Sequence, residues 1–396
     1  MSVIAGKIEK FLSGASWIRK MFEEGDRLRK IHGADKVYDF TLGNPVNEPP
    51  EKFHRELKKL ADSPIPGMHR YMSNAGYPET RQAVAEILSE SSGLNVTLKH
   101  VVMTVGAGGG LNVVLKSILN PGDEVIVLAP YFVEYKFYID NHSGVAREVS
   151  TDENFLPDIE AISSAVNQKT RAIIINSPNN PTGVVYPPAV LSELDKLVSE
   201  KSRQYGRPIY VISDEPYAKI AYDVQVPCVF KYINNAVIVT SHSKDLALPG
   251  ERIGYVAANP NIDNVDLLIE ALVFCNRTLG FVNAPALMQR LVANLQKESV
   301  NIEEYRAKRD LLYNNLTQLG FEMVKPQGAF YLFPKSPLDD DVEFARLALK
   351  HNILVVPGAG FGKRGYFRLA YCIDKKVIEN SLPAWKALAS ELKLKK

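Results

Sequence analysis

One lysine of this chain follows an apolar segment so closely that its charge needs an explanation. Lys244 ends the sequence Ser-His-Ser-Lys (241–244), which comes directly after the apolar run 236–240. An uncompensated ammonium group beside a buried strand is unfavourable. Lysine is the residue that forms imines with aldehydes, and partial desolvation makes its amine a better nucleophile. The position therefore indicates a Schiff base with an aldehyde cofactor, while a surface lysine on a loop is the simpler interpretation of this motif alone.

A carboxylate stands at the end of a second apolar run. Asp214 lies in Ser-Asp-Glu-Pro-Tyr (213–217), directly after the run 209–212. A carboxylate at the mouth of a buried strand needs a cationic partner, and a protonated pyridine nitrogen would be one. Because Asp is also a good helix N-cap, a cap is an equal alternative for this residue.

Two loops after other apolar runs could hold a polar ligand. Asn180 lies in Asn-Ser-Pro-Asn-Asn-Pro-Thr-Gly (176–183), where Pro and Gly impose a tight turn that fixes the Asn side chain. The glycine-rich segment 106–110 opens the helical stretch 111–119, and free backbone N–H groups at a helix start bind anions. An ordinary strand-to-helix loop and a flexible loop are the respective alternatives.

An arginine also interrupts an apolar segment near the end of the chain. Arg368 lies in Gly-Tyr-Phe-Arg-Leu-Ala (365–370). A guanidinium inside an apolar strand suggests bidentate binding of a carboxylate, whereas an arginine on an edge strand would simply face water.

The order and placement of these motifs resemble those of the class I/II aminotransferases, the aspartate aminotransferase family of fold-type I pyridoxal phosphate enzymes. The resemblance extends from Leu-Gly-Asn-Pro (42–45) to Arg368. It implies that pyridoxal 5′-phosphate is the cofactor and that an amino group moves between an L-amino acid and a 2-oxo acid in a ping-pong cycle. Carbon–sulfur β-lyases and other lyases on the same fold would use the same residues, so they are the alternative.

The resemblance also implies roles for individual residues. Lys244 matches the family's Schiff-base lysine, which also carries the proton. Asp214 matches the carboxylate that keeps the pyridine nitrogen protonated. Tyr217 and Asn180 match the pair that hydrogen-bonds the phenolic oxygen of the ring. The expected catalytic residues are therefore Lys244, Asp214 and Tyr217.

The remaining cofactor contacts follow from the same resemblance. The phosphate group is expected to bind the following residues: Gly106, Ala107, Gly108, Ser241, Ser243 and Arg252. Family members often have a hydroxyl residue near the position of Gly108, and the glycine here leaves the phosphate more dependent on backbone N–H groups and the two serines. Phe132 matches an aromatic residue over the ring, with Tyr131 as the choice if the alignment shifts by one.

Substrate and subunit contacts are expected at further positions. Arg368 matches the arginine that binds the substrate α-carboxylate, and Gly43 and Asn180 approach the same group. Tyr71 matches a tyrosine that reaches the neighbouring subunit's phosphate, which implies a homodimer with shared active sites. Arg277 lies near a position that can read a distal carboxylate, although an arginine that caps a helix end is the favoured alternative.

Alternating elements must position all of these residues. The runs 124–128, 171–175, 209–212 and 236–240 are rich in Val and Ile, and helical patterns separate them. Such runs are typical of a mostly parallel sheet with helices on both faces. The family resemblance implies that this sheet is of the seven-stranded type. Ligands of these sheets bind beyond the carboxyl ends of the strands.

The pattern changes after Gly280 and predicts a second, smaller α+β domain. A long charged helical stretch is followed by short strands and a closing helix. We expect a large pyridoxal-phosphate-binding α/β domain at 49–285. We expect residues 1–48 and 286–396 to form the small domain together, with the segment before Pro45 packed against the C-terminal part.

Composition narrows the possible partners and the compartment. The chain has 396 residues, 46% hydrophobic and 23% charged, with a formal net charge of +2. This balance is typical of a soluble globular protein and gives no electrostatic reason to expect nucleic acid or an anionic membrane surface as partner. No apolar run has the length to span a bilayer. The chain has three cysteines, Cys228, Cys275 and Cys372, which are too far apart in the sequence for a metal site. Because their number is also odd, we expect free, unreactive thiols in a reducing cytoplasm and no metal.

Overall fold

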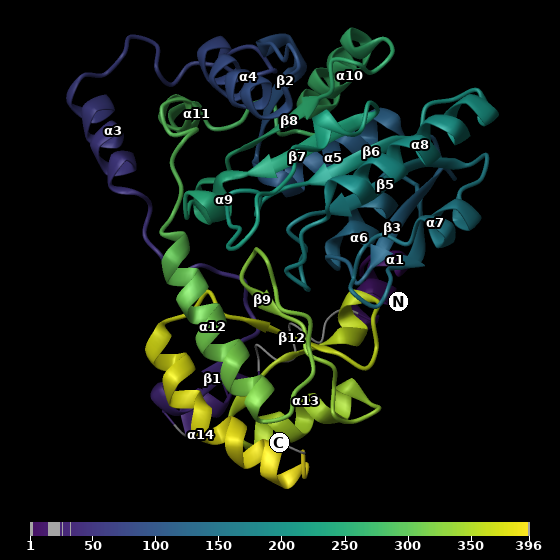
Figure 1. The fold of residues 1–396 in the computed structure, drawn as a ribbon. Helices are drawn as coiled ribbons and strands as arrows, with labels where there is room; N and C mark the ends of the chain where they lie inside the picture. Colours follow the sequence, from purple (N-terminus) through teal and green to yellow (C-terminus); the bar gives the residue numbers. More distant parts are fainter. Residues whose placement is uncertain (1–2, 15–23, 26, 32, 395–396) are drawn as a thin grey trace.

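A seven-stranded sheet forms the centre of the larger part of the molecule (Figure 1). The computed structural model describes residues 3–14, 24–25, 27–31 and 33–394. The strands follow the order β2-β8-β7-β6-β5-β3-β4, and every neighbouring pair is parallel except those that β8 makes with β2 and β7. Their bounds are β2 (Val101–Thr104), β3 (Glu124–Ala129), β4 (Val145–Ser150), β5 (Thr170–Asn176), β6 (Tyr210–Asp214), β7 (Ala236–Ser241) and β8 (Gly254–Ala258).

Helices cover both faces of this sheet, which confirms the predicted fold class. Alternate side chains of each strand point to opposite faces, and they divide into two apolar clusters. One cluster packs against α4 (Pro78–Ser92), α7 (Ile159–Ala165), α8 (Pro188–Tyr205) and α11 (Ala286–Ala293). The other packs against α5 (Gly106–Ile118), α6 (Glu134–Asn141) and α10 (Val265–Thr278). The central strands are buried on both sides, as their continuous Val and Ile runs require, whereas the edge strand β4 is largely exposed.

The smaller part of the molecule has its own core around Trp385, Phe344 and Phe367. A three-stranded antiparallel sheet has the order β11-β12-β9, and a two-stranded parallel sheet pairs β1 with β10. Helices α12, α13 and α14 lie around these sheets at the bottom of Figure 1. The bounds are β1 (Tyr38–Asp39), β9 (Tyr331–Leu332), β10 (Ile353–Leu354), β11 (Val356–Pro357), β12 (Phe367–Ala370), α12 (Ile302–Gln318), α13 (Asp341–Lys350) and α14 (Lys375–Glu391).

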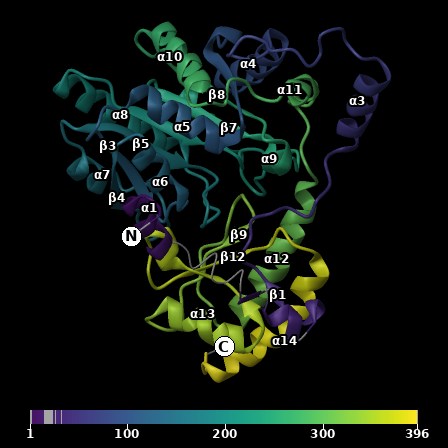
Figure 2. The same cartoon turned by 180° about the vertical axis from the view of Figure 1, so that it is seen from behind.

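The segments before α4 divide between the two parts. Strand β1 joins the C-terminal part through β10. Helix α1 (Gly6–Gly14) lies instead against α6 of the larger part, which Figures 1 and 2 both show. There Lys7 Nζ is 2.5 Å from Asp140 Oδ2, and the Phe11 and Phe137 rings are 4.9 Å apart. This differs from the expectation that the whole segment before Pro45 packs with the C-terminal part, because α1 has its own contacts with α6.

We propose the same division into a large and a small domain, with one refinement at its boundary. Helix α11 contributes Met288 and Leu291 to the core that contains α4, while α12 contributes Leu312 to the core around Trp385. The large domain is therefore proposed to include α11. Helix α3 (Glu51–Asp62) precedes α4 on the same side of the molecule.

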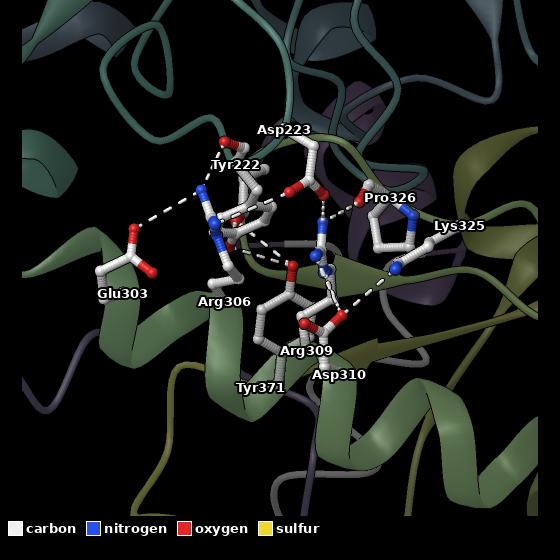
Figure 3. A network of polar contacts seen from close by, with 10 residues as sticks. Tyr222, Asp223, Glu303, Arg306, Arg309, Asp310, Lys325, Pro326 and Tyr371 are labelled. Carbon is white, nitrogen blue, oxygen red and sulfur yellow. Dashed lines mark hydrogen bonds and ion pairs between the residues drawn. The ribbon is translucent and has the colours of Figure 1, made fainter.

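An ion-pair network around the buried side chain of Arg309 joins α12 to the loop after β6 (Figure 3). Arg309 is almost completely buried, and its guanidinium lies 2.9 Å from Asp223 Oδ2 and 2.9 Å from Asp310 Oδ1. Arg306 Nη2 donates to the Tyr222 carbonyl at 2.7 Å. A buried cation with paired carboxylates loses much of its stabilisation if one partner is removed. The network therefore fixes the loop that follows Tyr217 against the helix of the smaller part.

No helix in the described residues is long and apolar enough to cross a membrane.

Candidate active site

A cavity of about 230 Å³ lies at the carboxyl ends of the central strands and collects most of the residues singled out in the sequence. Parallel strands place the loops that follow them at one edge of the sheet. The predicted residues among those that line the cavity are Ala107, Gly108, Phe132, Asn180, Asp214, Tyr217, Ser241, Ser243, Lys244 and Arg252. Hollows of about 560 and 510 Å³ lie elsewhere, beside Lys308 and Arg309. The smaller cavity is the better candidate because the chemically distinctive groups converge on it.

Lys244 lies in a short helix that follows β7, and its side chain is largely buried. Ser241 caps α9 (His242–Asp245), its Oγ accepting from Ser243 N at 3.0 Å. Lys244 Nζ donates to the Gly43 carbonyl at 2.6 Å. Burial lowers the pKa of Lys244, and the nearby Arg368 and Arg252 act in the same direction. The amine is therefore more often neutral than an ordinary lysine, which favours nucleophilic attack on an aldehyde. The surface-lysine alternative does not hold.

Asp214 presents a buried oxygen that has no partner. It is the last residue of β6, and its Oδ2 accepts from Tyr135 Oη at 2.5 Å. Its Oδ1 has no hydrogen-bond partner among the described residues. Burial raises the pKa of Asp214 to about 7, against the opposing effect of the Tyr135 hydrogen bond. The residue caps no helix, so the cap interpretation is wrong. A cationic ligand group, such as a protonated pyridine nitrogen, fits this oxygen.

Arg368 is buried in the middle strand of the small sheet and does not face water. Its Nη1 donates to Asn180 Oδ1 at 3.1 Å and its Nη2 to the Thr41 carbonyl at 2.5 Å. Its guanidinium lies over the rings of Tyr331 and Phe361, with its Cζ 4.7 and 4.8 Å from their centroids. Its Nε has no partner in the described part of the chain. A buried guanidinium with an unused donor is suited to bind a carboxylate.

Two tyrosines and a glycine connect Arg368 to Lys244. The Tyr217 and Tyr331 hydroxyls are 2.9 Å apart, and burial raises the pKa of Tyr217 well above its usual value. A Cβ atom at Gly43 would collide with the Tyr331 hydroxyl. Position 43 therefore needs glycine if its carbonyl is to reach Lys244.

The opposite end of the cavity has the features of an anion site. Helix α5 begins at Gly106, which has a φ of 77°. The Ser241 and Ser243 hydroxyls are 2.5 Å apart, and both line the cavity with Arg252. A Cβ atom at Gly106 would lie 3.0 Å from Arg252 Nη2, so glycine lets the guanidinium approach the helix start. Hydroxyls, a guanidinium and helix N–H groups together suit a phosphate.

The choice between the two adjacent aromatic residues is resolved by their directions. Phe132 lines the cavity and makes an edge contact with Tyr135 at 5.6 Å. Tyr131 donates its hydroxyl to Glu148 Oε2 at 2.8 Å and is not among the lining residues. Of the two aromatic residues, Phe132 is therefore the one that faces the cavity.

Five predicted positions are not among the residues that line the cavity of the single chain. Three of them, Gly43, Gly106 and Arg368, contact lining residues, whereas Tyr71 and Arg277 lie apart from the cavity. Tyr71 is 89% exposed. Arg277 is exposed near the end of α10, with its guanidinium 5.4 Å from the Phe274 ring. Neither residue lines the cavity.

Some residues that shape the site were not singled out in the sequence. Tyr135 contacts Asp214 from 79 positions away, and Tyr331 contacts Tyr217 from 114 positions away. Tyr138 lines the cavity from the next turn of the same helix as Tyr135. A tyrosine in an apolar helix face or strand is most often a core residue, so the type and spacing of these tyrosines carried no sign of their contacts.

The chain was compared with known proteins. Residues 35–384 match the model of the family Aminotransferase class I and II. Aspartate/prephenate aminotransferase of Thermus thermophilus is 34% identical over 357 residues, which cover 88% of this chain and 90% of the relative. Aspartate aminotransferase of Pyrococcus horikoshii is 30% identical over 388 residues, 95% of each chain.

Solved structures agree with these relatives. An aminotransferase of Eubacterium rectale has a TM-score of 0.96 and 38% identity, with 100% of both chains covered. Aspartate aminotransferase of T. thermophilus with maleate has a TM-score of 0.85 and 29% identity, with 98% of this chain and 100% of that chain covered. The chain therefore belongs to the aminotransferase class I and II family. It is an aminotransferase with the fold-type I architecture, and the lyase alternative is not favoured.

Proposed function

We propose that this aminotransferase binds pyridoxal 5′-phosphate in the 230 Å³ cavity. The observation that carries the proposal is the unpartnered, buried Asp214 Oδ1, which lines the same cavity as the desolvated amine of Lys244. When bound, the cofactor supplies an aldehyde that reacts with amines and a protonated ring that withdraws electrons from the substrate α-carbon. The dependence of this family on the cofactor supports the same assignment.

Four residues that line the cavity are proposed to act on the cofactor and the substrate. Lys244 is proposed to attach the cofactor and then to carry a proton from the substrate α-carbon on its Nζ atom. Asp214 would hold the ring nitrogen in its protonated form. Tyr217 would donate to the phenolic oxygen, as would the amide N–H groups of Asn180, whose Oδ1 is occupied by Arg368.

Residues that line the cavity, together with Arg368 beside it, would orient the ligands. The phosphate would bind at the start of α5 with Ser241, Ser243 and Arg252. Arg368 would bind the α-carboxylate of every amino acid and 2-oxo acid, because its buried guanidinium has an unused N–H group. Phe132 would cover one face of the ring and exclude water from it.

We propose L-aspartate as the preferred donor. The names of the relatives in T. thermophilus and P. horikoshii support this choice, as does the solved T. thermophilus structure with the dicarboxylate maleate. Among the described residues that line the cavity, the cations are Lys244 and Arg252. A distal carboxylate would therefore need a cation from another element or from a second subunit.

We further propose a homodimer with shared sites. Tyr71 is a large, 89% exposed side chain in the segment that the family resemblance assigns to the neighbouring subunit's phosphate. A cytoplasmic location is proposed as well, and the three free cysteines support it.

Transfer of isotopic nitrogen tests this function. Purified protein with added cofactor is incubated with ¹⁵N-labelled L-aspartate and 2-oxoglutarate, and the products are analysed by mass spectrometry. We expect the label in glutamate, with L-alanine, L-methionine and L-phenylalanine as weaker donors in parallel reactions. Release of the label as ammonia would instead identify a lyase, and equal rates for all donors would refute the preference for aspartate.

A further inference from the structure

A tyrosine hydroxyl occupies the corner of the cavity at the start of α5. A Cβ atom built on Gly108 would lie 3.0 Å from Tyr138 Oη. Tyr138 and Gly108 line the cavity together with Ser241, Ser243 and Arg252. A side chain at position 108 would therefore compete with the phenol for the same place, and glycine leaves that place to Tyr138.

Helix α6 directs two hydroxyl groups into the site. Tyr135 and Tyr138 are three residues apart, so they lie on the same side of the helix. Tyr135 Oη donates to Asp214 at 2.5 Å, at the end of the cavity proposed for the ring nitrogen. Tyr138 Oη has no hydrogen-bond partner among the described residues and lies at the opposite end, beside Gly108. Its proton is therefore available to a ligand.

The protonation state of Tyr138 and the neighbouring guanidinium suit a donor to an anion. Arg252 lines the same end of the cavity and contributes positive charge. Burial raises the pKa of Tyr138 to about 12, the carboxylates of Glu134 and Asp214 add to the rise and Arg252 opposes it, so the phenol keeps its proton at neutral pH and acts as a donor. An O–H group beside a guanidinium and a helix start donates readily to a phosphate oxygen.

We propose that Tyr138 Oη donates a hydrogen bond to the phosphate group of the cofactor and completes the phosphate site at Gly108. The inference rests on the proposed cofactor site and adds a ligand to it from helix α6. Tyr138 also packs against the apolar cluster between α5 and the sheet. The test must therefore separate the hydroxyl from the ring.

The matched variant is Tyr138→Phe, which keeps the ring and removes the hydroxyl. Apoprotein is titrated with pyridoxal phosphate and, separately, with pyridoxal, which has no phosphate group. Fluorescence and absorbance give the two dissociation constants. Loss of one hydrogen bond to a charged group should weaken pyridoxal phosphate binding by roughly ten- to a hundredfold. Pyridoxal binding should stay unchanged.

Two further variants make the result specific. Tyr135→Phe changes the ring end and should weaken both ligands by a similar factor. Gly108→Ser in the Tyr138→Phe background places a hydroxyl in the vacated corner and should restore part of the affinity for pyridoxal phosphate. In the wild-type background the same serine would lie against Tyr138 Oη and should weaken binding.

Three results would overturn the inference. They are equal loss of both ligands in Tyr138→Phe, no loss of either, and no recovery in the double variant. Failure of the wild-type apoprotein to bind pyridoxal phosphate would refute the proposed cofactor site instead, so the two failures are distinguishable.

Discussion

Replacement of Asp214 by Asn should stabilise the cofactor-free protein at alkaline pH. Burial raises the pKa of Asp214 from 3.8 to about 7. In the unfolded chain the carboxyl loses its proton near pH 4, whereas the folded chain keeps it until pH 7. The folded state therefore binds more protons between these values, and the stability that this group contributes falls as pH rises through this window. An Asn side chain has no such dependence.

The size of the effect follows from the pKa shift. Each pKa unit corresponds to about 1.4 kcal/mol, so the Asp214 carboxyl costs the folded apoprotein about 4 kcal/mol above pH 7, where it is ionised, and about 2 kcal/mol at pH 5, where it must take up a proton on folding. The advantage of Asp214→Asn should therefore grow by roughly 2–3 kcal/mol from pH 5 to pH 8. With about 2 cal/mol/K of unfolding entropy per residue, this growth corresponds to roughly 3 °C in Tm for a chain of this length.

Thermal unfolding of apoprotein and cofactor-loaded protein at fixed protein concentration measures this difference. On addition of pyridoxal phosphate the sign should invert, because the ring nitrogen pairs with Asp214 but not with Asn. Glu215→Gln is the control: burial also raises the pKa of Glu215 to about 7, but that carboxyl accepts from Ser213 and does not line the cavity. It should change the pH dependence without inversion. If Asp214→Asn stays the more stable protein after cofactor addition, Asp214 does not pair with the cofactor.

Other residues give separate predictions. Mixed dimers of the two inactive variants Lys244→Ala and Tyr71→Ala contain one site with both residues intact, so activity should recover in part if Tyr71 acts across the interface; no recovery after demonstrated subunit exchange would refute the shared site. Arg368→Ala removes a buried contact with the α-carboxylate, worth roughly 2–5 kcal/mol. Its kcat/KM should fall more than tenfold for all donors alike, and a loss confined to one donor would count against this role. Arg277→Ala should leave the aspartate-to-alanine ratio of kcat/KM unchanged, because Arg277 lies against Phe274 at the surface; a fall in this ratio would identify it as a reader of the distal carboxylate.

The sequence was sufficient to predict those residues whose position depends only on one strand and the loop that follows it. The Val- and Ile-rich runs predicted the central strands. Asp214 is the last residue of β6, and Lys244 lies in α9, three residues after the end of β7, because each follows its own run closely. Such positions depend on neighbours in the chain, so their patterns are visible in the sequence.

Contacts between distant elements could not be predicted in the same way. Tyr135 reaches Asp214 only because α6 packs beside the carboxyl end of β6. Arg368 was ambiguous between a buried and an exposed strand, since strand order is not encoded in β12 itself; pairing with β9 and β11 decides it. The position of α1 depends likewise on contacts with α6, far along the chain.

Reduction of the cofactor-loaded protein with borohydride tests the central claim most directly. Borohydride makes the link between the cofactor and its lysine permanent, and peptide mapping by mass spectrometry then locates the modified residue. The buried amine of Lys244, with its lowered pKa, should carry the pyridoxyl group in one peptide per chain. A pyridoxyl group on any other lysine, with Lys244 unmodified, would contradict the account.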